Sequence, residues 1–526
     1  MKFPFLSAPP KVKLLNALTF TPQDNTRAAA KTCYSDKLLT EKGFQKRLKE
    51  AGRKERIGLI KERSSLIDDL YDSGHHTTFE HNTFQFSITQ VSRAAIHSFL
   101  HSHPFYNSEQ QSQRFAPIDT NSFTVPNISG GNLELYRDTL HLQIGAFESL
   151  QEILFKKAKE AYEEIFQGRK GKYDSSIAKK AQEIARYVLP IAMHSKLHHT
   201  INEMTLLRLN RLSNQPDFPL EQRLIVEGMM SSLEERGIEL GDVVEDPIEG
   251  TDMIEYSLME LHRGQTSTRE FFREFDSYLN GKRSVLEGYN PNAEFLLANA
   301  VRGVVGISSQ DLSDKDAIAF ALDSNKNPYL SEKMNVNPHS RLMRALLAVN
   351  YTFRKKLSHT ADSQSQRHRT MPGIYPILGL NIGDEPDVIV PSLIEADQEA
   401  LDLFMETNQT TWRNIQKLIG NNVSVEQASY LLPNAKAIRK WESGSLVGLL
   451  HKQNKRLCYN AQEEIWRLAR DEATEIKEVH PEIGQYFGAP CDLRFSGKVT
   501  PYCSEGPRYC GVPVWRLSEK QRKRVI

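Results

Sequence analysis

The stretch Gln-Ser-Gln-Arg in the first quarter of the chain places a hydroxyl, an amide and a guanidinium side by side. Ser112 and Gln113 can donate hydrogen bonds, and Arg114 can hold a phosphate through two parallel N–H groups. A phosphate site and a solvated loop or helix end are therefore both open interpretations. The same four residue types return in the second half of the chain, beginning with Gln364.

This second stretch runs on into Arg367, His368 and Arg369. Positive charges this close repel one another unless an anion or an acidic side chain lies nearby. A bound phosphate and a neighbouring Asp or Glu meet this need equally well. Arg456 lies near the start of the segment Lys455–Ala469, whose apolar spacing predicts an amphipathic helix. The alternative role of Arg456 is that of a surface charge.

A polar turn precedes a predicted strand in the first half. The segment Gly74–His81 reads GHHTTFEH, and the aromatic strand FQF follows it. The turn glycine, the hydroxyl of Thr77 and the carboxylate of Glu80 can together bind a polar ligand. Composition alone favours a polar loop that contains one or two satisfied histidines.

Three patterns occur twice and in the same order. Residues 176–189 have the apolar spacing of a helix face, and the phrase EIARYVLP ends at Pro190; the phrase EQASYLLP ends at Pro433, 243 positions later. A capping-box pair, Ser424 and Gln427, opens the second phrase. The strand-like FQF and YTF and the two QSQR stretches are the other pairs. These repeats predict two diverged copies of one α+β domain.

The bulk composition fits a two-domain globular protein, with 526 residues, 39% hydrophobic and 25% charged. We predict a first domain at 1–245, a charged helical spacer at 246–290, a second domain at 291–488 and a Cys-containing tail at 489–526. The net charge of +1 disfavours bulk binding of nucleic acid, and no apolar stretch suits a membrane span or a secretory signal. With an odd number of cysteines, we expect a cytoplasmic protein.

Taken in order, the motifs resemble those of the flavin-dependent thymidylate synthases over most of both halves. That family has a small residue, a Gly-His-x-Thr-Pro-Phe-Glu-His turn, an aromatic strand, Gln-x-x-Arg-His-Arg and Gln-Ser-x-Arg-Tyr. A helix with Glu-x-Ala-Arg-x-Val-Leu-Pro follows, then an asparagine, and then an arginine shortly before Ala-Gln-x-Glu-Ile. Each motif is short, and their order and spacing make the resemblance specific.

The first copy keeps one set of these residues. They are Cys33 at the small-residue position, Thr77 and Glu80 in the turn, Ser112 and Arg114 of QSQR, Arg186 of EIARYVLP, and Asn202. At the Arg-His-Arg position this copy has residues 101–103, His-Ser-His, and Ser98 replaces the glutamine. Ser213 takes the place of the late arginine.

The second copy keeps the complementary set. Its members are Gln364, Arg367, His368, Arg369 and Arg456. The Gly-His turn has become RLMRALLA, the helix arginine is Ser429, and the asparagine is Ser445. In the family, one subunit supplies the residues kept here and its neighbours supply the others. The losses therefore predict an active enzyme with one working set of site residues, split between the two halves.

The resemblance implies a reaction and a role for each residue. It implies conversion of dUMP to dTMP, in which methylenetetrahydrofolate supplies the carbon and NADPH supplies hydride by way of FAD. The residues expected on dUMP are Ser112, Gln113, Arg114, Arg186, Gln364 and Arg456. The catalytic candidates are Ser112, Arg114 and Arg456, of which Arg456 would stabilise negative charge on the uracil ring. The residues expected on FAD are Cys33, Thr77, Glu80, Asn202, Arg367, His368 and Arg369.

The family also implies an assembly. Its members are homotetramers, so two of these chains are expected to form a homodimer that serves as a pseudo-tetramer. Two other classes of protein remain open. One is a catalytically inactive paralogue that binds flavin or nucleotide. The other is a nucleic-acid-binding protein that uses QSQRHR and the tail, which the near-neutral charge disfavours.

Three cysteines, Cys491, Cys503 and Cys510, crowd into the last forty residues and look like the Cys-rich tail of some family members. With a fourth ligand such as His480 they could bind zinc. Three free thiols in a cytosolic tail are the alternative, and the spacings fit no standard zinc finger. We therefore assign no metal ligand among them.

Overall fold

The computed structural model describes residues 4–165, 173–522 and 524. This part of the chain is an α+β structure with two small antiparallel sheets, which confirms the expected fold class. The chain divides into two compact units. Unit 1 comprises residues 1–138, 190–263 and 415–432, and unit 2 comprises residues 139–189, 264–414 and 433–526. Among the described residues, no helix combines the length and the apolar character needed to cross a membrane.

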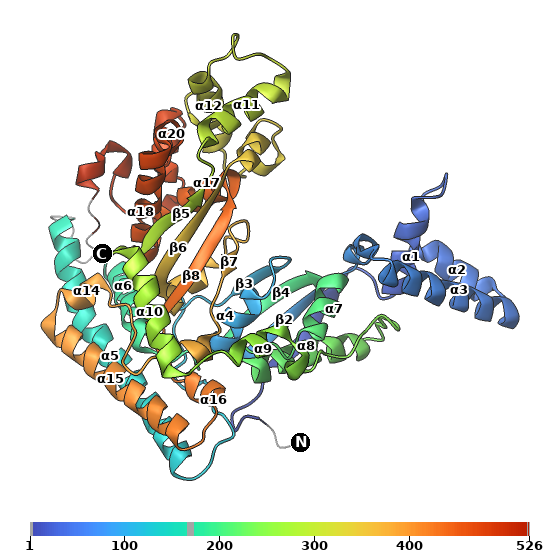
Figure 1. Ribbon diagram of the computed structural model, residues 1–526, viewed down its shortest axis with the longest axis horizontal. Coiled ribbons are helices and arrows are strands. Elements are labelled where there is room, and N and C mark those ends of the chain that lie inside the picture. The colour runs from blue at the N-terminus through green and yellow to red at the C-terminus, as the bar shows by residue number, and fades with distance from the viewer. Residues whose placement is uncertain (1–3, 166–172, 523, 525–526) are drawn as a thin grey trace. The chain divides into compact units, whose positions relative to one another are not determined.

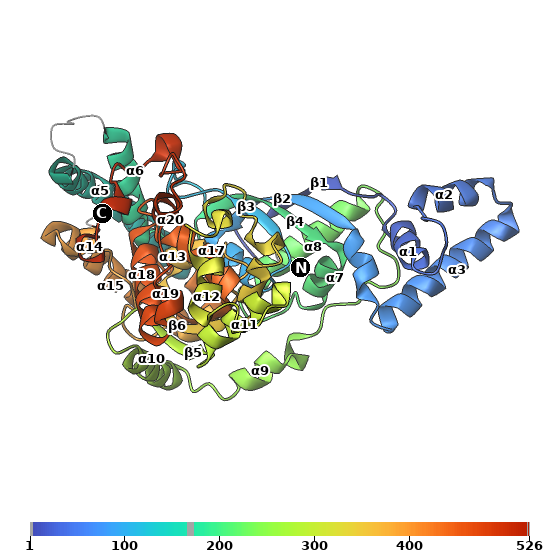
Figure 2. The ribbon, with the colours of Figure 1, turned by 90° about the horizontal axis from the view of Figure 1, so that it is seen from above.

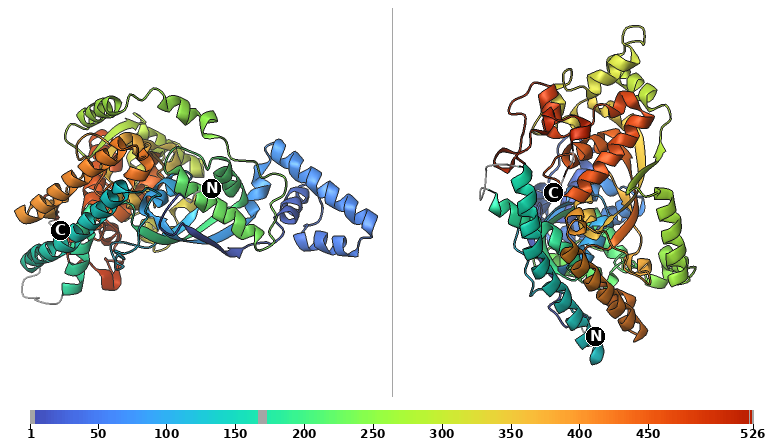
Figure 3. Two further views of the ribbon diagram at one scale, coloured as in Figure 1. Left: turned by 90° about the horizontal axis from the view of Figure 1, so that it is seen from below. Right: turned by 90° about the vertical axis from the view of Figure 1, so that its left-hand side faces the viewer.

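Unit 1 is built around a sheet with the strand order β1-β2-β4-β3. The strands are β1 (Lys11–Ala17), β2 (Thr83–Ser92), β3 (Asn107–Gln110) and β4 (His194–Asn202). The helices are α1 (Pro22–Thr32), α2 (Glu41–Glu50), α3 (Arg53–Asp72), the 3-10 helix η1 (His76–His81), α4 (Arg93–His101), α7 (Glu203–Arg211), α8 (Pro219–Glu234), α9 (Ile254–Met259) and α16 (Val425–Ser429). Helices α1, α2 and α3 pack together (Figures 2 and 3).

Unit 2 is built around a second sheet, with the order β5-β6-β8-β7 (Figure 1). The strands are β5 (Ser284–Tyr289), β6 (Asn350–Ser358), β7 (Gly373–Ile374) and β8 (Ala437–Ser445). The helices are α6 (Asp174–Ala185), α10 (Gln265–Leu279), α11 (Ala293–Val305), α12 (Asp314–Leu322), α13 (His359–Ser365), α14 (Ser392–Glu395), α17 (Leu446–Arg456), α18 (Glu463–Val479), α19 (Pro481–Gly484) and α20 (Pro490–Ser496). The chain passes from one unit to the other within the long helices α5 (Gly131–Ile165) and α15 (Gln398–Gly420).

The two sheets repeat one topology, as the paired motifs predict. FQF lies in β2 and YTF in β6, and in each strand alternate aromatic side chains are buried because successive residues face opposite sides. The pairing of β2 with β4 begins at Thr83 opposite Asn202, and that of β6 with β8 at Asn350 opposite Ser445. β2 carries one additional residue, Gln90, at a bulge where its φ is 58°.

Each unit contains a helical segment from the other repeat. The phrase EIARYVLP belongs to the first repeat, but residues 139–189 lie in unit 2; the phrase EQASYLLP belongs to the second repeat, but residues 415–432 lie in unit 1. Leu432 accepts a backbone hydrogen bond from Ile191 in unit 1, and Leu189 accepts one from Asn434 in unit 2. The compact units are therefore not contiguous in the sequence.

Local structure agrees with most of the expected elements. The capping box of Ser424 and Gln427 is present. The helix expected over 176–189 ends as α6 at Ala185 and continues as a 3-10 turn. The continuous helix predicted for Lys455–Ala469 is wrong.

Here α17 ends at Arg456, and α18 begins only at Glu463. The side chains in the intervening turn bind elsewhere in the unit: Asn460 donates to the Arg508 carbonyl, and Gln462 donates to Tyr187. The apolar spacing therefore belongs to two helices joined by a turn. The strand β5 lies within the range expected as spacer.

Candidate functional site

Residues of both repeats meet around Gln462 in unit 2. Arg186 begins the 3-10 turn after α6, Gln364 lies near the end of α13, and Gln462 is the N-cap of α18. The Gln462 side-chain oxygen accepts hydrogen bonds from Arg186, at 3.1 Å, and from the Gln364 amide. Arg456, the last residue of α17, donates to the Gln364 carbonyl at 2.7 Å. We call these four residues the Gln462 cluster.

A buried carboxylate fixes the first-repeat segment of this cluster. The hydroxyl of Tyr187 donates to Glu464, whose two oxygens also accept from the backbone N–H of Ser358 at 2.7 Å and from its hydroxyl at 2.6 Å. Burial, and then the Glu464 charge, raise the pKa of Tyr187 well above its usual value, so the phenol remains a donor. Because Arg186 is adjacent to Tyr187, this contact sets the position of its backbone.

Unit 1 contains the same arrangement with the repeats exchanged. Tyr430 of the second repeat donates to Glu221 at 2.8 Å, and Glu221 accepts from the backbone and the hydroxyl of Ser92, both at 2.7 Å. Position 429, next to this tyrosine, is the serine that replaces the helix arginine. The contacts that support the cluster are therefore present in both units, whereas the arginine at position 186 has no counterpart at position 429.

The Arg-His-Arg segment forms the turn after α13. Arg367 and Arg369 are exposed, whereas His368 is buried. Burial, followed by the charges of Arg456 and Lys452, lowers the pKa of His368 well below its usual value. The histidine is thus neutral at pH 7, and the two guanidinium groups face solvent on either side of it. His368 and Arg456 line one small cavity together with Lys355, Ser365, Lys452, Ile465, Leu468, Ala469 and Glu472.

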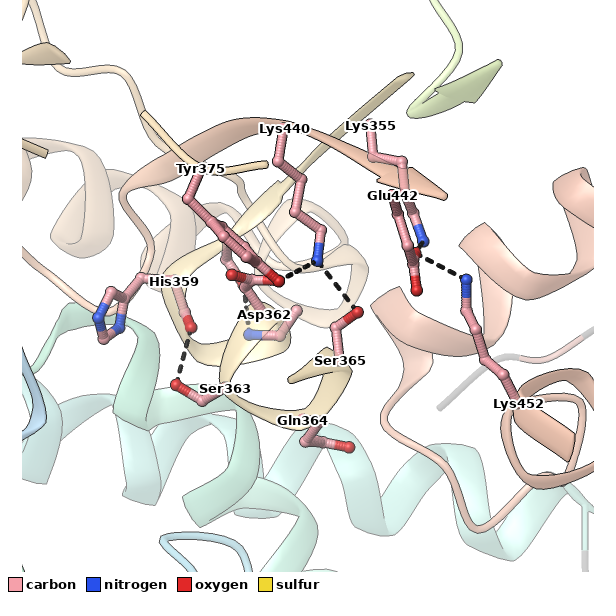
Figure 4. Close-up of polar contacts among 12 residues, drawn as sticks. Lys355, His359, Asp362, Ser363, Gln364, Ser365, Tyr375, Lys440, Glu442 and Lys452 are labelled. Atoms are coloured by element: carbon pink, nitrogen blue, oxygen red, sulfur yellow. Dashed lines mark hydrogen bonds and ion pairs between the residues drawn. The ribbon is translucent and has the colours of Figure 1, made fainter. Parts of the chain in front are cut away.

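Beside this cavity lies a network of buried charges, which we call the lysine–glutamate network: Lys355, Glu442, Lys452 and Glu472. Lys452 contacts Glu442 at 2.8 Å and Glu472 at 2.9 Å, and Lys355 contacts Glu472 at 2.6 Å. Burial opposes the ionisation of both Lys355 and Glu442. The charges of Glu442 and Glu472 outweigh burial at Lys355 and raise its pKa. The charges of Lys355 and Lys452 outweigh burial at Glu442 and lower its pKa. Figure 4 shows Lys452 pointing at Glu442.

A second buried ion pair joins α13 to β8. Lys440 contacts Asp362 at 2.5 Å, the hydroxyl of Ser365 at 3.2 Å and that of Tyr375 at 3.0 Å (Figure 4). Asp362 and Ser365 flank the cluster residue Gln364. This ion pair therefore ties the helix that presents Gln364 to the central strand β8.

The expected FAD-binding residues of the first repeat lie on three elements of unit 1. Cys33 follows α1, Thr77 and Glu80 lie in η1, and Asn202 caps α7 by accepting from the Thr205 N–H at 2.8 Å. The first three are exposed, and Asn202 is half-buried.

One buried amide joins these three elements. Asn82 follows η1, and its amide nitrogen donates to Thr26 of α1 at 2.9 Å and to the Glu203 carboxylate of α7. Its backbone carbonyl also accepts from the Glu203 N–H at 2.9 Å. This residue has no recognisable signal in the sequence, because an asparagine after a histidine-rich turn has no distinctive pattern.

The expected phosphate-binding residues of the first repeat also lie in unit 1, in the loop after β3. Ser112 accepts a hydrogen bond from the Arg114 backbone N–H at 3.1 Å, and the Arg114 guanidinium lies 4.9 Å from the centre of the Phe115 ring. Gln113 is buried, and the other two are half-buried. Unit 2 thus brings together Arg186, Gln364 and Arg456, with Arg367, His368 and Arg369 on the adjoining turn.

Other functional candidates were missed by sequence reading. Gln462 and Glu464 lie inside the motif Ala-Gln-x-Glu-Ile, and Tyr187 lies inside EIARYVLP. In the sequence these motifs serve only to locate Arg456 and Arg186. The lysine–glutamate network had a usable signal: Lys355 and Glu442 occupy positions in β6 and β8 where alternation places apolar side chains. Opposite charges at such positions indicate a buried ion pair.

The chain matches one protein family in two segments. The family model described as thymidylate synthase complementing protein matches residues 14–236 and 285–482, which correspond to the two repeats.

Three curated relatives are flavin-dependent thymidylate synthases. The protein of Clostridium tetani is 31% identical over 202 residues, or 38% of this chain and 73% of the relative. That of Geobacter sulfurreducens is 28% identical over 233 residues, 42% of this chain and 91% of the relative. That of Haloarcula marismortui is 26% identical over 237 residues, 42% of this chain and 88% of the relative.

Each relative thus aligns with less than half of this chain, whereas the family model matches it twice. The chain therefore belongs to the thymidylate synthase complementing protein family, in a tandem form that carries two copies of the family domain.

Proposed function

We propose that this protein catalyses the flavin-dependent reductive methylation of dUMP to dTMP, with methylenetetrahydrofolate as carbon donor and NADPH as reductant. The observation that carries the proposal is the Gln462 cluster, in which Arg186 of the first repeat meets Gln364 and Arg456 of the second. Each repeat has lost the residues that the other contributes. Complementary loss at one cluster is expected of a working site and not of two copies that decay independently.

The cluster suits an anionic nucleotide. Arg186 and Arg456 supply two permanent positive charges, and Gln364 and Gln462 supply amides that can pair with a uracil edge. Bound dUMP would take hydrogen bonds that now join the cluster residues to one another. In this proposal Arg456 stabilises negative charge that develops on the uracil ring, an effect that is strongest where water is excluded. Ser112, Gln113 and Arg114 are assigned to the phosphate side of dUMP.

The residues present also fit FAD. Arg367 and Arg369 are exposed cations on the turn after α13, and the buried, neutral His368 between them adds no charge of its own. Such a turn matches a diphosphate. We assign Cys33, Thr77, Glu80 and Asn202 to the same cofactor. When bound, FAD supplies the transfer of hydride, and the protein's part is to bind and orient.

For the assembly we propose a cytoplasmic homodimer that acts as a pseudo-tetramer. A mixture of Arg114→Ala chains with Arg456→Ala chains tests how sites are shared. Activity that returns on mixing indicates sites built from two chains, and a mixture that stays inactive indicates sites within one chain. A strict monomer, measured as mass in solution, would contradict the assembly.

The proposed reaction is tested with purified protein, first by its visible spectrum and then by dTMP formation. We expect a yellow protein, or one that gains flavin absorbance on titration with FAD, and dTMP that depends on dUMP, methylenetetrahydrofolate and NADPH. A protein that binds flavin but makes no dTMP would be the inactive paralogue. A protein that never takes up flavin would remove both interpretations.

A further inference from the structure

Four of the five cysteines gather in unit 2, although they come from three separate segments. Cys458 lies in the turn between α17 and α18, and Cys491 is the second residue of α20. Cys503 and Cys510 flank a 3-10 turn at Gly506–Arg508. Hydrogen bonds connect the segments close to the thiols, from Asn460 to residue 508, two before Cys510, and from Arg494 to residue 501, two before Cys503. The fifth cysteine, Cys33, is exposed in unit 1.

Contacts other than those of the thiols hold the three segments in place. The Asn460 side chain donates to the Arg508 carbonyl at 2.6 Å, which joins the Cys458 turn to the tail. Both terminal nitrogens of Arg522 contact Asp492 at 2.8 Å, and Arg494 of α20 donates to the Pro501 carbonyl at 2.8 Å. The gathering of the thiols therefore follows from the packing of the tail, not from the thiols alone.

The four thiols are half-buried free cysteines, unlike the exposed Cys33. Half-buried cysteines held close together without a disulfide are the ligands that a structural zinc ion takes.

We propose that Cys458, Cys491, Cys503 and Cys510 bind one Zn²⁺ ion in a structural four-cysteine site. Four thiolates are the ligand set of closed structural zinc centres. Among the described residues, no three of these sulfur atoms lie within 4.8 Å of one another, so the ion must draw the gathered thiols together. His480, the fourth ligand considered from the sequence, bonds instead to the Tyr351 hydroxyl at 3.0 Å.

The site would hold the tail against the turn that carries the Gln462 cluster. Cys458 lies between Arg456 and Gln462 in the sequence, and Trp466 already donates to the Leu457 carbonyl at 3.2 Å on the same turn. Zinc at Cys458 would fix this turn at a second point. The existence of the site does not depend on the proposed reaction, because metal content is measured without substrate.

The test is the metal content of the purified full-length chain, measured by inductively coupled plasma mass spectrometry after dialysis against metal-free buffer. We expect about one zinc per chain. Cys458→Ser and Cys503→Ser should each lower the zinc content severalfold, and Cys33→Ser, the matched control in the other unit, should leave it unchanged. Replacement of zinc by Co²⁺ should give thiolate-to-cobalt charge transfer and the intense visible bands of tetrahedral coordination.

Several results would overturn the proposal: zinc well below stoichiometry in the wild-type chain, iron in its place, or a Cys458→Ser chain that keeps its zinc. If the serine variants do not fold, thiol titration of the native wild-type chain decides. One thiol, Cys33, should react rapidly, and the other four should react only when a mercurial displaces zinc. Five rapidly reacting thiols, or disulfides among the four, would contradict a zinc site.

Discussion

The two sheets have one topology but differ in what fills their inner faces. In unit 1, Ile88 of β2 stands opposite Leu197 of β4, and both belong to an apolar core. At the matching register in unit 2, Lys355 of β6 stands opposite Lys440 of β8, and both are buried. The helices show the same difference. Leu209 and Met229 belong to the apolar core of unit 1, and the residues 243 positions later are Lys452 and Glu472.

This difference shows that the fold does not need the charges. A mainly apolar inner face, in which the buried His199 stands at the register of Glu442, supports the sheet of unit 1. Buried ion pairs are often no more stabilising than apolar residues of similar size. The charges of unit 2 lie where the repeat keeps its glutamine, its Arg-His-Arg turn and its late arginine. Lys452 and Lys355 line the same cavity as His368 and Arg456. We infer that the network orients these groups at some cost in stability.

The largest loss of stability is expected when one lysine of the lysine–glutamate network is removed and both glutamates are kept. Lys452→Met leaves Glu442 and Glu472 with Lys355 alone, and an uncompensated buried charge costs ~3–5 kcal/mol. The matched Leu209→Met keeps the volume of an apolar site and should cost less than ~1.5 kcal/mol. Urea unfolding measures both free energies. Equal losses would show that the two inner faces respond alike, contrary to this account.

Buried acids of the two units should respond to pH in opposite senses. Burial raises the pKa of Glu203 in unit 1 to about 7, whereas the lysines lower that of Glu442 in unit 2. Glu203 therefore binds a proton more tightly in the folded chain. Its contribution to stability should rise as pH falls from about 7 toward 4.5, by at most ~3 kcal/mol.

Urea unfolding midpoints measured between pH 5 and 8 test whether this contribution to stability rises as pH falls. Glu203→Gln, which imitates the protonated acid, should remove that part of the pH dependence, so the difference from wild type should shrink as pH falls. A difference that is constant over this range would show that Glu203 is ionised in the folded chain.

A smaller effect should separate the two tyrosine contacts. Tyr187→Phe and Tyr430→Phe each remove one hydrogen bond to a buried carboxylate, at a cost of ~1–3 kcal/mol. Only Tyr187 also accepts from Gln462, so only its variant should slow dTMP formation. Unfolding and turnover measured on both variants test this. An equal loss of activity from Tyr430→Phe would mean that both tyrosines support a site.

The sequence was sufficient to predict the repeat, the α+β class and the paired aromatic strands, because alternation and helix spacing act locally. The sequence could not reveal that residues 139–189 of the first repeat pack in unit 2. The two repeats offer similar packing surfaces, and the sequence pattern does not show which of them a helix contacts. Gln462 illustrates the same limit for the site. It appears in the sequence as part of a helix, and only tertiary contacts show it as the acceptor shared by Arg186 and Gln364.

The central claim is that a single working site combines Arg186 of one repeat with Arg456 of the other. It is tested most directly by dTMP turnover in four variants that retain wild-type circular dichroism. Arg186→Ala and Arg456→Ala should each lose ~2–4 kcal/mol of transition-state stabilisation, about 30- to 1000-fold in kcat/KM. Their counterparts 243 positions away, Ser429→Ala and Ser213→Ala, should stay near wild type. Equal losses in all four variants would contradict the claim.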